Sequence, residues 1–179
     1  KEEVIFTSYD KNNFKKNHEL DAVDSVHCII SKYNKNDLVL DEILNNSKDP
    51  RIKEYEKLFE RDSIFIMSGG GYFVEGWKEQ FIARLLEIHL AIKNGAKVFL
   101  VGQSIGPIFS QVGIEYIKRA LDLCSYISVR DDSSKEHLES IGINKKIFLA
   151  PDLAMIISDI FPKKNSNKNI INIMPGAYT

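Results

Sequence analysis

The segment GQSIGP at residues 102–107 could carry chemistry, because it places Ser104 in the G-x-S-x-G spacing of a nucleophile elbow. In a hydrolase that elbow leads directly into a helix, and a histidine serves as the base of the serine. Here Gly106 and Pro107 follow closely, which favours a turn, and the downstream sequence holds only His137. We therefore expect Ser104 to be a turn residue whose hydroxyl and neighbouring NH groups face a ligand crevice. A serine hydrolase is the less favoured alternative.

A second segment that could take part in binding or catalysis is the glycine run from Gly69 to Gly71, which follows an apolar stretch. Residues without a β carbon let the backbone approach an anion closely and present NH groups to it. A tight turn between a strand and a helix would need the same glycines, and we weigh the two interpretations equally. No Gly-Lys-Ser/Thr follows, and Val74 stands where the last glycine of G-x-G-x-x-G would be. A P-loop NTPase and a standard NAD enzyme are therefore disfavoured.

Two further residues follow apolar runs and could contact a ligand. Arg130 could hold a phosphate or carboxylate through two parallel hydrogen bonds, although it could instead pair with Asp131 or Asp132. For these two aspartates we favour helix capping and ion pairing over a ligand role. Asp152 could orient a hydroxyl group of a substrate, or could cap the segment after it.

The histidines and cysteines do not indicate a metal site or a disulfide framework. His89 falls on an apolar helical face and is interpreted as a satisfied core histidine. Cys28 and Cys124 lie in apolar surroundings and are expected to be buried thiols, which fits a reducing, cytoplasmic setting. The remaining histidines form no metal-ligand spacing with a cysteine or carboxylate cluster: His18, His27 and His137.

Composition excludes some classes of protein. The 179 residues include 24 Lys and Arg against 25 Asp and Glu, and this balance argues against nucleic-acid binding. No apolar run approaches the roughly 18 residues of a membrane span, so a soluble protein is expected.

Strands and helices are predicted to alternate along the chain. Strands are expected at 3–8, 25–30, 63–67, 96–101, 126–129 and 146–150, with a loop at 9–19. Helices are expected within 38–60 with a break near Asp49 and Pro50, at 77–94 and around 116–124. A last helix is expected to begin at a capping box formed by Ser133 and Glu136.

This alternation predicts a doubly wound parallel (Rossmann-like) α/β sheet with helices on both faces. Its ligand crevice should lie at the carboxyl ends of the strands, where the glycine turn, the Ser104 turn and Arg130 meet. We expect an α/β domain at 1–160, a linker at 161–169, and at 170–179 the start of a second domain or a returning segment.

Four segments together resemble the polysaccharide pyruvyl transferase family in order and spacing, over about residues 63–155: IFIMSGGGYF, AKVFLVGQSIGP, ISVRDDSSKEHLESIGI and LAPDLA. The family often has glycine at the position of Ser104, which also argues against a nucleophilic serine. The resemblance implies the amino-terminal half of a GT-B-like two-domain enzyme, with the catalytic acid in a second domain beyond Thr179.

The reaction implied by the resemblance transfers a pyruvyl group from phosphoenolpyruvate to a sugar of a cell-surface polysaccharide, giving a pyruvate ketal. Phosphoenolpyruvate would be a co-substrate, with no other cofactor and no metal. The acceptor would be a glycan or a lipid-linked sugar, which would allow peripheral membrane association, and no transmembrane segment is expected. The residues expected to bind substrate are Gly69, Gly70, Gly71, Gln103, Ser104, Gly106, Arg130 and Asp152.

The sequence is also compatible with two other functions. One is a GT-B glycosyltransferase in surface glycan synthesis, which would bind a nucleoside diphosphate. The other is a non-catalytic module that binds a sugar or an anion.

Overall fold

A computed structural model of the chain describes residues 4–8, 10–30, 40–45, 49–59 and 61–156. The predicted linker at 161–169 and the segment at 170–179 lie outside these residues. The described strands are β1 (Phe6–Ser8), β2 (Ala22–Asp24), β3 (Ile64–Ser68), β4 (Lys97–Gln103), β5 (Tyr126–Val129) and β6 (Phe148–Leu149). The described helices are α1 (Lys11–His18), α2 (His27–Ile30), α3 (Leu40–Asn45), α4 (Pro50–Glu56), α5 (Lys78–Lys93), α6 (Gln111–Leu123), α7 (Asp132–Ser140) and the 3-10 helix η1 (Leu153–Ile156).

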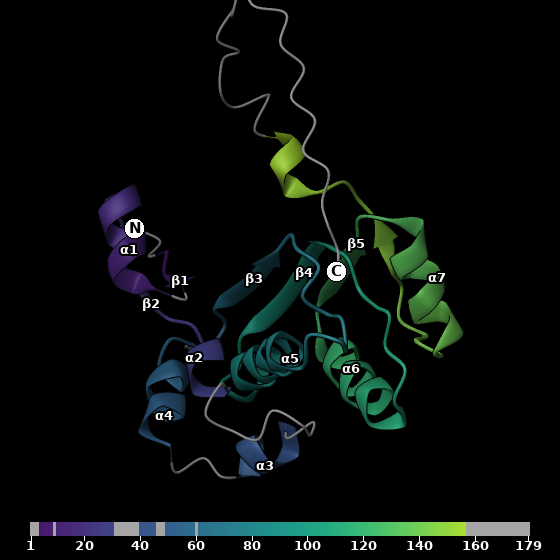
Figure 1. The fold of residues 1–179 in the computed structure, drawn as a ribbon, viewed down its shortest axis with the longest axis horizontal. Helices are drawn as coiled ribbons and strands as arrows, with labels where there is room; N and C mark the ends of the chain where they lie inside the picture. Colours follow the sequence, from purple (N-terminus) through teal and green to yellow (C-terminus); the bar gives the residue numbers. More distant parts are fainter. Residues whose placement is uncertain (1–3, 9, 31–39, 46–48, 60, 157–179) are drawn as a thin grey trace, which may run out of the picture.

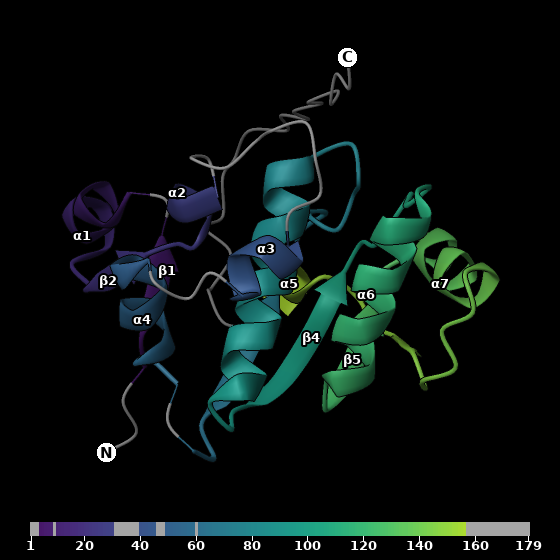
Figure 2. The ribbon, with the colours of Figure 1, turned by 90° about the horizontal axis from the view of Figure 1, so that it is seen from below.

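A parallel sheet of four strands in the order β3-β4-β5-β6 forms the centre of the molecule (Figure 1). Helices α5, α6 and α7 each connect one strand to the next, and α5 and α6 lie side by side in both ribbon views (Figures 1 and 2). The prediction of a parallel α/β sheet built from alternating strands and helices is confirmed.

Helices cover one face of this sheet in the described part of the chain. Strands that follow in chain order through right-handed crossovers have all their helices on the same face. On that face Val98 and Leu100 are fully buried. On the opposite face Ile64 is 64% exposed and Ile66 58% exposed. The prediction of helices on both faces is therefore wrong for the described residues, because the strand order never reverses among these four strands.

Helix α5 is the packing centre of the covered face. Its apolar residues recur every three or four positions, so one broad stripe turns inward. Phe81, Leu85 and Ile88 are fully buried, and helices α2, α3, α4 and α6 all pack against α5. Burial of a large apolar side chain contributes about 1.5–3 kcal/mol, so this helix anchors the domain.

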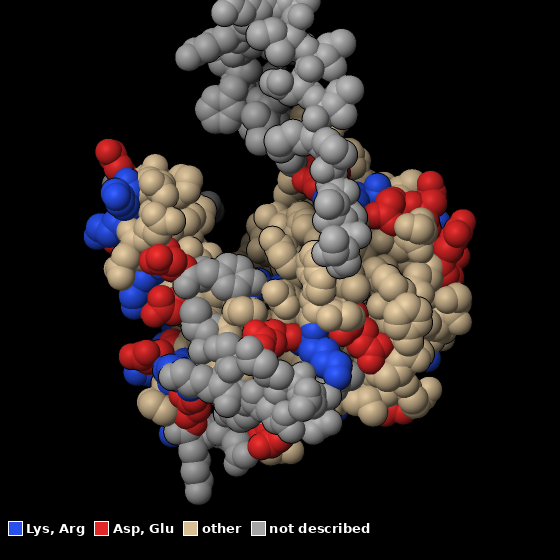
Figure 3. Space-filling model, in the orientation of Figure 1, with Lys and Arg blue, Asp and Glu red and all other residues tan. Residues whose placement is uncertain are grey.

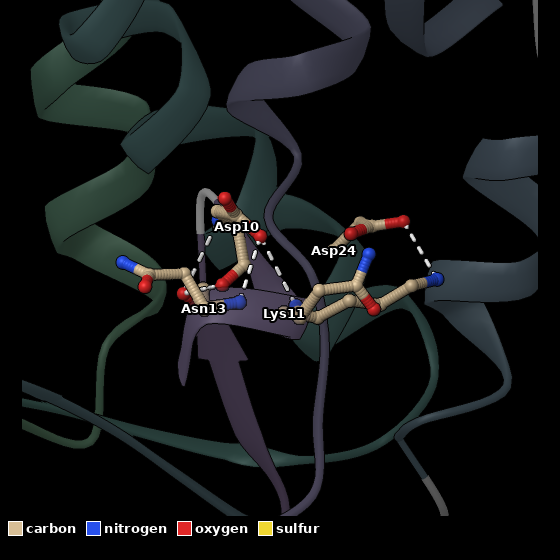
Figure 4. A network of polar contacts seen from close by, with 6 residues as sticks. Asp10, Lys11, Asn13 and Asp24 are labelled. Carbon is tan, nitrogen blue, oxygen red and sulfur yellow. Dashed lines mark hydrogen bonds and ion pairs between the residues drawn. The ribbon is translucent and has the colours of Figure 1, made fainter. Parts of the chain in front are cut away.

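The amino-terminal part differs from prediction in two places. The segment 9–19, expected to be a loop, contains helix α1, whose capping residue Asp10 accepts hydrogen bonds from the backbone NH groups of Asn12 at 3.1 Å and Asn13 at 3.0 Å (Figure 4). The strand expected at 25–30 is helix α2 instead.

Strands β1 and β2 form a separate parallel pair beside the main sheet (Figure 1). Between this pair and β3, the predicted helical region is confirmed as α3 and α4. Helix α4 begins after Asp49, whose carboxylate accepts from the backbone NH of Arg51 at 3.0 Å, so the predicted break falls at the expected place.

Candidate functional site

The turns that follow β3 and β4 are joined by backbone hydrogen bonds at the carboxyl edge of the sheet. The NH of Ser104 donates to the carbonyl of Gly70 at 2.8 Å, and the NH of Gly106 donates to the carbonyl of Phe73 at 2.8 Å. The glycine turn and the Ser104 turn therefore form one connected rim, as their shared position after parallel strands predicts.

The three glycines of the first turn serve different needs. Gly69 and Gly70 have φ values of +55° and +106°, which only glycine adopts without strain. Gly71 has no positive φ, and a β carbon there would lie 3.9 Å from Nη2 of Arg130. The turn geometry thus explains two of the glycines, and the third places bare backbone beside the arginine.

Arg130 follows β5, and its guanidinium lies on this rim. Its Nε donates to Oγ of Ser104 at 2.7 Å, and its Nη1 forms an ion pair with Oδ2 of Asp152 at 2.5 Å. The partner of Arg130 is thus Asp152, which reaches it from the loop after β6, and not Asp131 or Asp132, the partners that the sequence suggested as the alternative to a ligand role. We refer to Gly71, Ser104, Arg130 and Asp152 as the Arg130 cluster.

The Arg130 cluster is open to solvent. The side chain of Arg130 is 35% exposed and that of Asp152 is 30% exposed. A ligand from solution can therefore reach both groups, and an anion must either displace the carboxylate of Asp152 or bind beside it.

Among the described residues, no histidine forms a hydrogen bond with the hydroxyl of Ser104. Its hydroxyl donates to Oδ2 of Asp131 at 2.6 Å and accepts from Arg130. The Nε2 atom of His137 instead accepts from the backbone NH of Ile108 at 3.1 Å. The hydroxyl thus positions Arg130, which agrees with the expectation of a turn residue and argues against a nucleophile.

Asp131 links this cluster to helix α7 as its capping residue. Its Oδ1 accepts from the backbone NH of Ser134 at 2.8 Å, so the predicted capping box that starts at Ser133 is wrong. Burial raises the pKa of Asp131, but hydrogen bonds from Ser104, Ser134 and Ser133 outweigh burial and lower the pKa to about 2. The carboxylate stays ionised at neutral pH, and the expected capping role is confirmed.

Two of the predicted site residues lie within the packing of the rim. Gln103 is fully buried, and its Nε2 donates to the carbonyl of Met67 at 2.9 Å. Gly106 has a φ of +97°, and a β carbon there would lie 2.4 Å from Cδ2 of His137. Both residues therefore shape the rim, in contrast to the exposed guanidinium of Arg130.

Two residues that the sequence reasoning missed hold the loop after β4. Oε2 of Glu75 accepts from the backbone NH groups of Phe109 at 2.7 Å and Ser110 at 2.8 Å. His137 supports the same loop through Ile108. No short motif marks such contacts, because each joins residues about thirty positions apart.

The described residues offer no metal site and no reactive cysteine. No group of three or more His, Cys, Asp or Glu side chains in this part of the chain could hold a metal ion. Cys124 is buried as predicted, and burial raises the pKa of its thiol to about 12, whereas the side chain of Cys28 is not described.

His89 is half-buried and its Nε2 finds no hydrogen-bond partner among the described residues, so it is not a satisfied core histidine. None of the described helices is long and apolar enough to cross a membrane.

The fold and the Arg130 cluster define a parallel α/β protein with a solvent-open site around Arg130 at the carboxyl edge of its sheet. The chain belongs to the polysaccharide pyruvyl transferase family, whose family model matches residues 4–179. This match includes the amino-terminal residues and points to a transferase that acts in polysaccharide modification. Comparisons with curated proteins and with solved structures found no match.

Proposed function

We propose that this protein transfers the pyruvyl group of phosphoenolpyruvate to two hydroxyls of one sugar in a polysaccharide, and that Arg130 binds the donor. The observation that carries the proposal is the fixed guanidinium of Arg130 beside the glycine turn. Family membership supports the transferred group and the polymeric acceptor. The donor and the ketal product are what the family resemblance implies, and the exposed guanidinium of Arg130 is compatible with an anionic donor.

The geometry around Arg130 suits a small anion. Ser104 and Asp152 hold its Nε and Nη1 atoms, so little side-chain freedom is lost when a ligand binds. Nη2 lies beside Gly71, which has no side chain of its own to obstruct an approaching carboxylate or phosphate. A charge-assisted hydrogen bond in this position is about twice as strong as a neutral one.

The proposed reaction needs cations at one end of the donor and an acid at the other. Protonation of the methylene carbon makes the central carbon electrophilic, and a sugar hydroxyl then attacks it. The carbon–oxygen bond to phosphate breaks, phosphate leaves with its electron pair, and a second hydroxyl closes the ketal. Fixed positive charge stabilises the departing phosphate. We assign this electrostatic role to Arg130, and we place the general acid in a second, GT-B-like domain.

A lipid-linked acceptor would bring the protein to the cytoplasmic surface of a membrane without a spanning segment. This part of the proposal follows from the class of acceptor, and fractionation of cells that make the natural protein tests it.

Ligand-dependent melting and phosphate release test the proposal on the natural protein. A ligand that binds the native state raises its stability by RT ln(1 + [L]/Kd). We expect phosphoenolpyruvate to raise the melting temperature, and phosphate to appear when a glycan acceptor is added. A rise with UDP and none with phosphoenolpyruvate would favour a glycosyltransferase. Binding without turnover for any acceptor would favour a binding module.

A further inference from the structure

A cavity of about 320 Å³ lies in the amino-terminal part, between strand β2 and helices α1, α2 and α4. It shares no lining residue with the Arg130 cluster, and the elements that form it lie on the other side of β3 and β4 from β5 (Figure 1). Its described lining consists of Lys11, Ala22, Val23, Asp24, Ser25, Ile29, Arg51, Glu54, Tyr55 and Leu58. We call it the β2 cavity.

Charged side chains of both signs line the β2 cavity in equal number. Nζ of Lys11 pairs with Oδ2 of Asp24 at 2.9 Å, across the start of helix α1 (Figure 4). Arg51 pairs with Asp49, which lies outside the lining, and Glu54 adds a second carboxylate to the cavity. In the space-filling view, positive and negative groups alternate over α1 and α4 (Figure 3). This balance leaves no surplus positive charge for an anion.

A buried network fixes the inner wall of the β2 cavity. The hydroxyl of Tyr55 donates to Oε1 of Glu87 at 3.1 Å, and Nη2 of Arg84 donates to Oγ of Ser25 at 3.2 Å. Arg84 and Glu87 pair with each other at 2.7 Å, and the Glu87 side chain is only 1% exposed. Burying an ion pair is costly, so it adds little to stability compared with apolar packing. The structural effect of this network is to hold the lining residues Ser25 and Tyr55 in fixed positions.

We propose that the β2 cavity binds one uncharged sugar ring of the acceptor polysaccharide, away from the ring that receives the pyruvyl group. This inference rests on the proposed function. Carboxylates accept hydrogen bonds from sugar hydroxyls, and Lys and Arg donate to them, so a lining of both signs matches a polyhydroxylated neutral ligand. The volume lies at the lower end of the range of roughly 300–1,000 Å³ for ligand pockets, which suits a single ring. A polymer has further rings beyond its reacting unit, and one of these is the proposed occupant of the β2 cavity.

Chemical-shift mapping of the backbone amides of the natural protein by NMR, with a panel of methyl hexosides and methyl N-acetylhexosaminides, tests this inference. We expect at least one of these sugars to bind and to shift the backbone amide signals of Val23 and Ser25. The variants Glu54→Gln and Asp24→Asn keep the side-chain shape and should weaken that binding about tenfold. The variant Glu42→Gln changes an exposed carboxylate on helix α3, outside the cavity, and should bind as the wild type does.

Kinetics with the polysaccharide acceptor provide a second measurement. We expect Glu54→Gln to raise the KM for the polymer about tenfold and to leave the KM for phosphoenolpyruvate unchanged. Sugar binding that is equal in all variants overturns the inference. Inorganic phosphate that shifts the same two amide signals and displaces the sugar also overturns it, because the cavity would then be an anion site.

The same experiments separate this inference from the proposed function. If phosphoenolpyruvate neither binds nor releases phosphate while sugars still shift the signals of Val23 and Ser25, the proposed donor is wrong and the cavity remains a sugar site. If phosphate release from phosphoenolpyruvate proceeds and no sugar reaches the cavity, the cavity assignment is wrong and the proposed donor stands.

Discussion

Replacement of Arg130 by methionine separates a ligand-binding role from a structural one. The ion pair between Arg130 and Asp152 is 35% and 30% exposed, and pairs of this kind contribute at most about 1 kcal/mol to stability. Two charge-assisted hydrogen bonds from the guanidinium to an anion contribute about 1.5–3 kcal/mol each. Taking the lower end because the site is open to solvent, the variant should lose about 3 kcal/mol of binding free energy, or about 100-fold in affinity.

Calorimetric titration with phosphoenolpyruvate and urea denaturation measure these two quantities on the same preparations. We expect Arg130→Met to bind phosphoenolpyruvate about 100-fold more weakly while its free energy of unfolding falls by about 1 kcal/mol or less. The matched control is Arg119→Met, since Arg119 forms a similar exposed pair with Asp41 at 2.6 Å, on helices α6 and α3. The control should lose similar stability and no affinity. Affinity within threefold of wild type in Arg130→Met would refute the reasoning.

Three other predictions concern the residues that hold the site and the core. Hydrogen bonds lower the pKa of Asp131 to about 2, so the stability that its carboxylate contributes is complete above the unfolded pKa of about 3.9 and is lost as the pH falls toward 2. Urea denaturation of Asp131→Asn at a series of pH values should lack this acid sensitivity. A pH profile equal to that of the wild type would contradict the assignment. Gly106→Ala forces a β carbon to 2.4 Å from the ring of His137 at a φ of +97°, so thermal denaturation should show a loss of at least about 2 kcal/mol, whereas Gly76→Ala, whose nearest contact is 4.0 Å, should stay within about 0.5 kcal/mol. Burial raises the pKa of Glu87 from 4.5 to about 7, so the folded state binds a proton more tightly than the unfolded state does, and the free energy of unfolding falls as the pH rises from 4.5 to about 7. Glu87→Gln should remove this dependence of stability on pH. A dependence that persists in the variant would assign it to another group.

The sequence predicts best where burial dictates the pattern. Helix α5 and strand β4 carry continuous apolar periodicity, and both lie within a few residues of the expected bounds. Helix α1 was missed because no residue in Lys11–His18 is buried, so it has no apolar stripe, and Asp10 is its only local indication. The apolar run 25–30 is ambiguous in the same way, since three apolar residues bury as readily in a short helix as in a strand.

The position of the candidate site could be predicted, but its internal contacts could not. Strand ends in a parallel sheet share one edge, so Gly71, Ser104 and Arg130 were expected near one another. The choice of Asp152 over Asp131 as the partner of Arg130 depends on how the loop after β6 folds back, which no local pattern records. The β2 cavity was not predicted at all, because its lining comes from separate elements with no motif in common.

The fate of the central carbon of phosphoenolpyruvate tests the account most directly. The natural protein is incubated with its polysaccharide and with phosphoenolpyruvate labelled with ¹³C at that carbon, and the products are read by ¹³C and ³¹P NMR. We predict that the label enters the polysaccharide as a ketal carbon and that an equal amount of phosphate is released. Label that stays in phosphoenolpyruvate, while a nucleotide sugar is consumed and the polymer grows, would contradict the account.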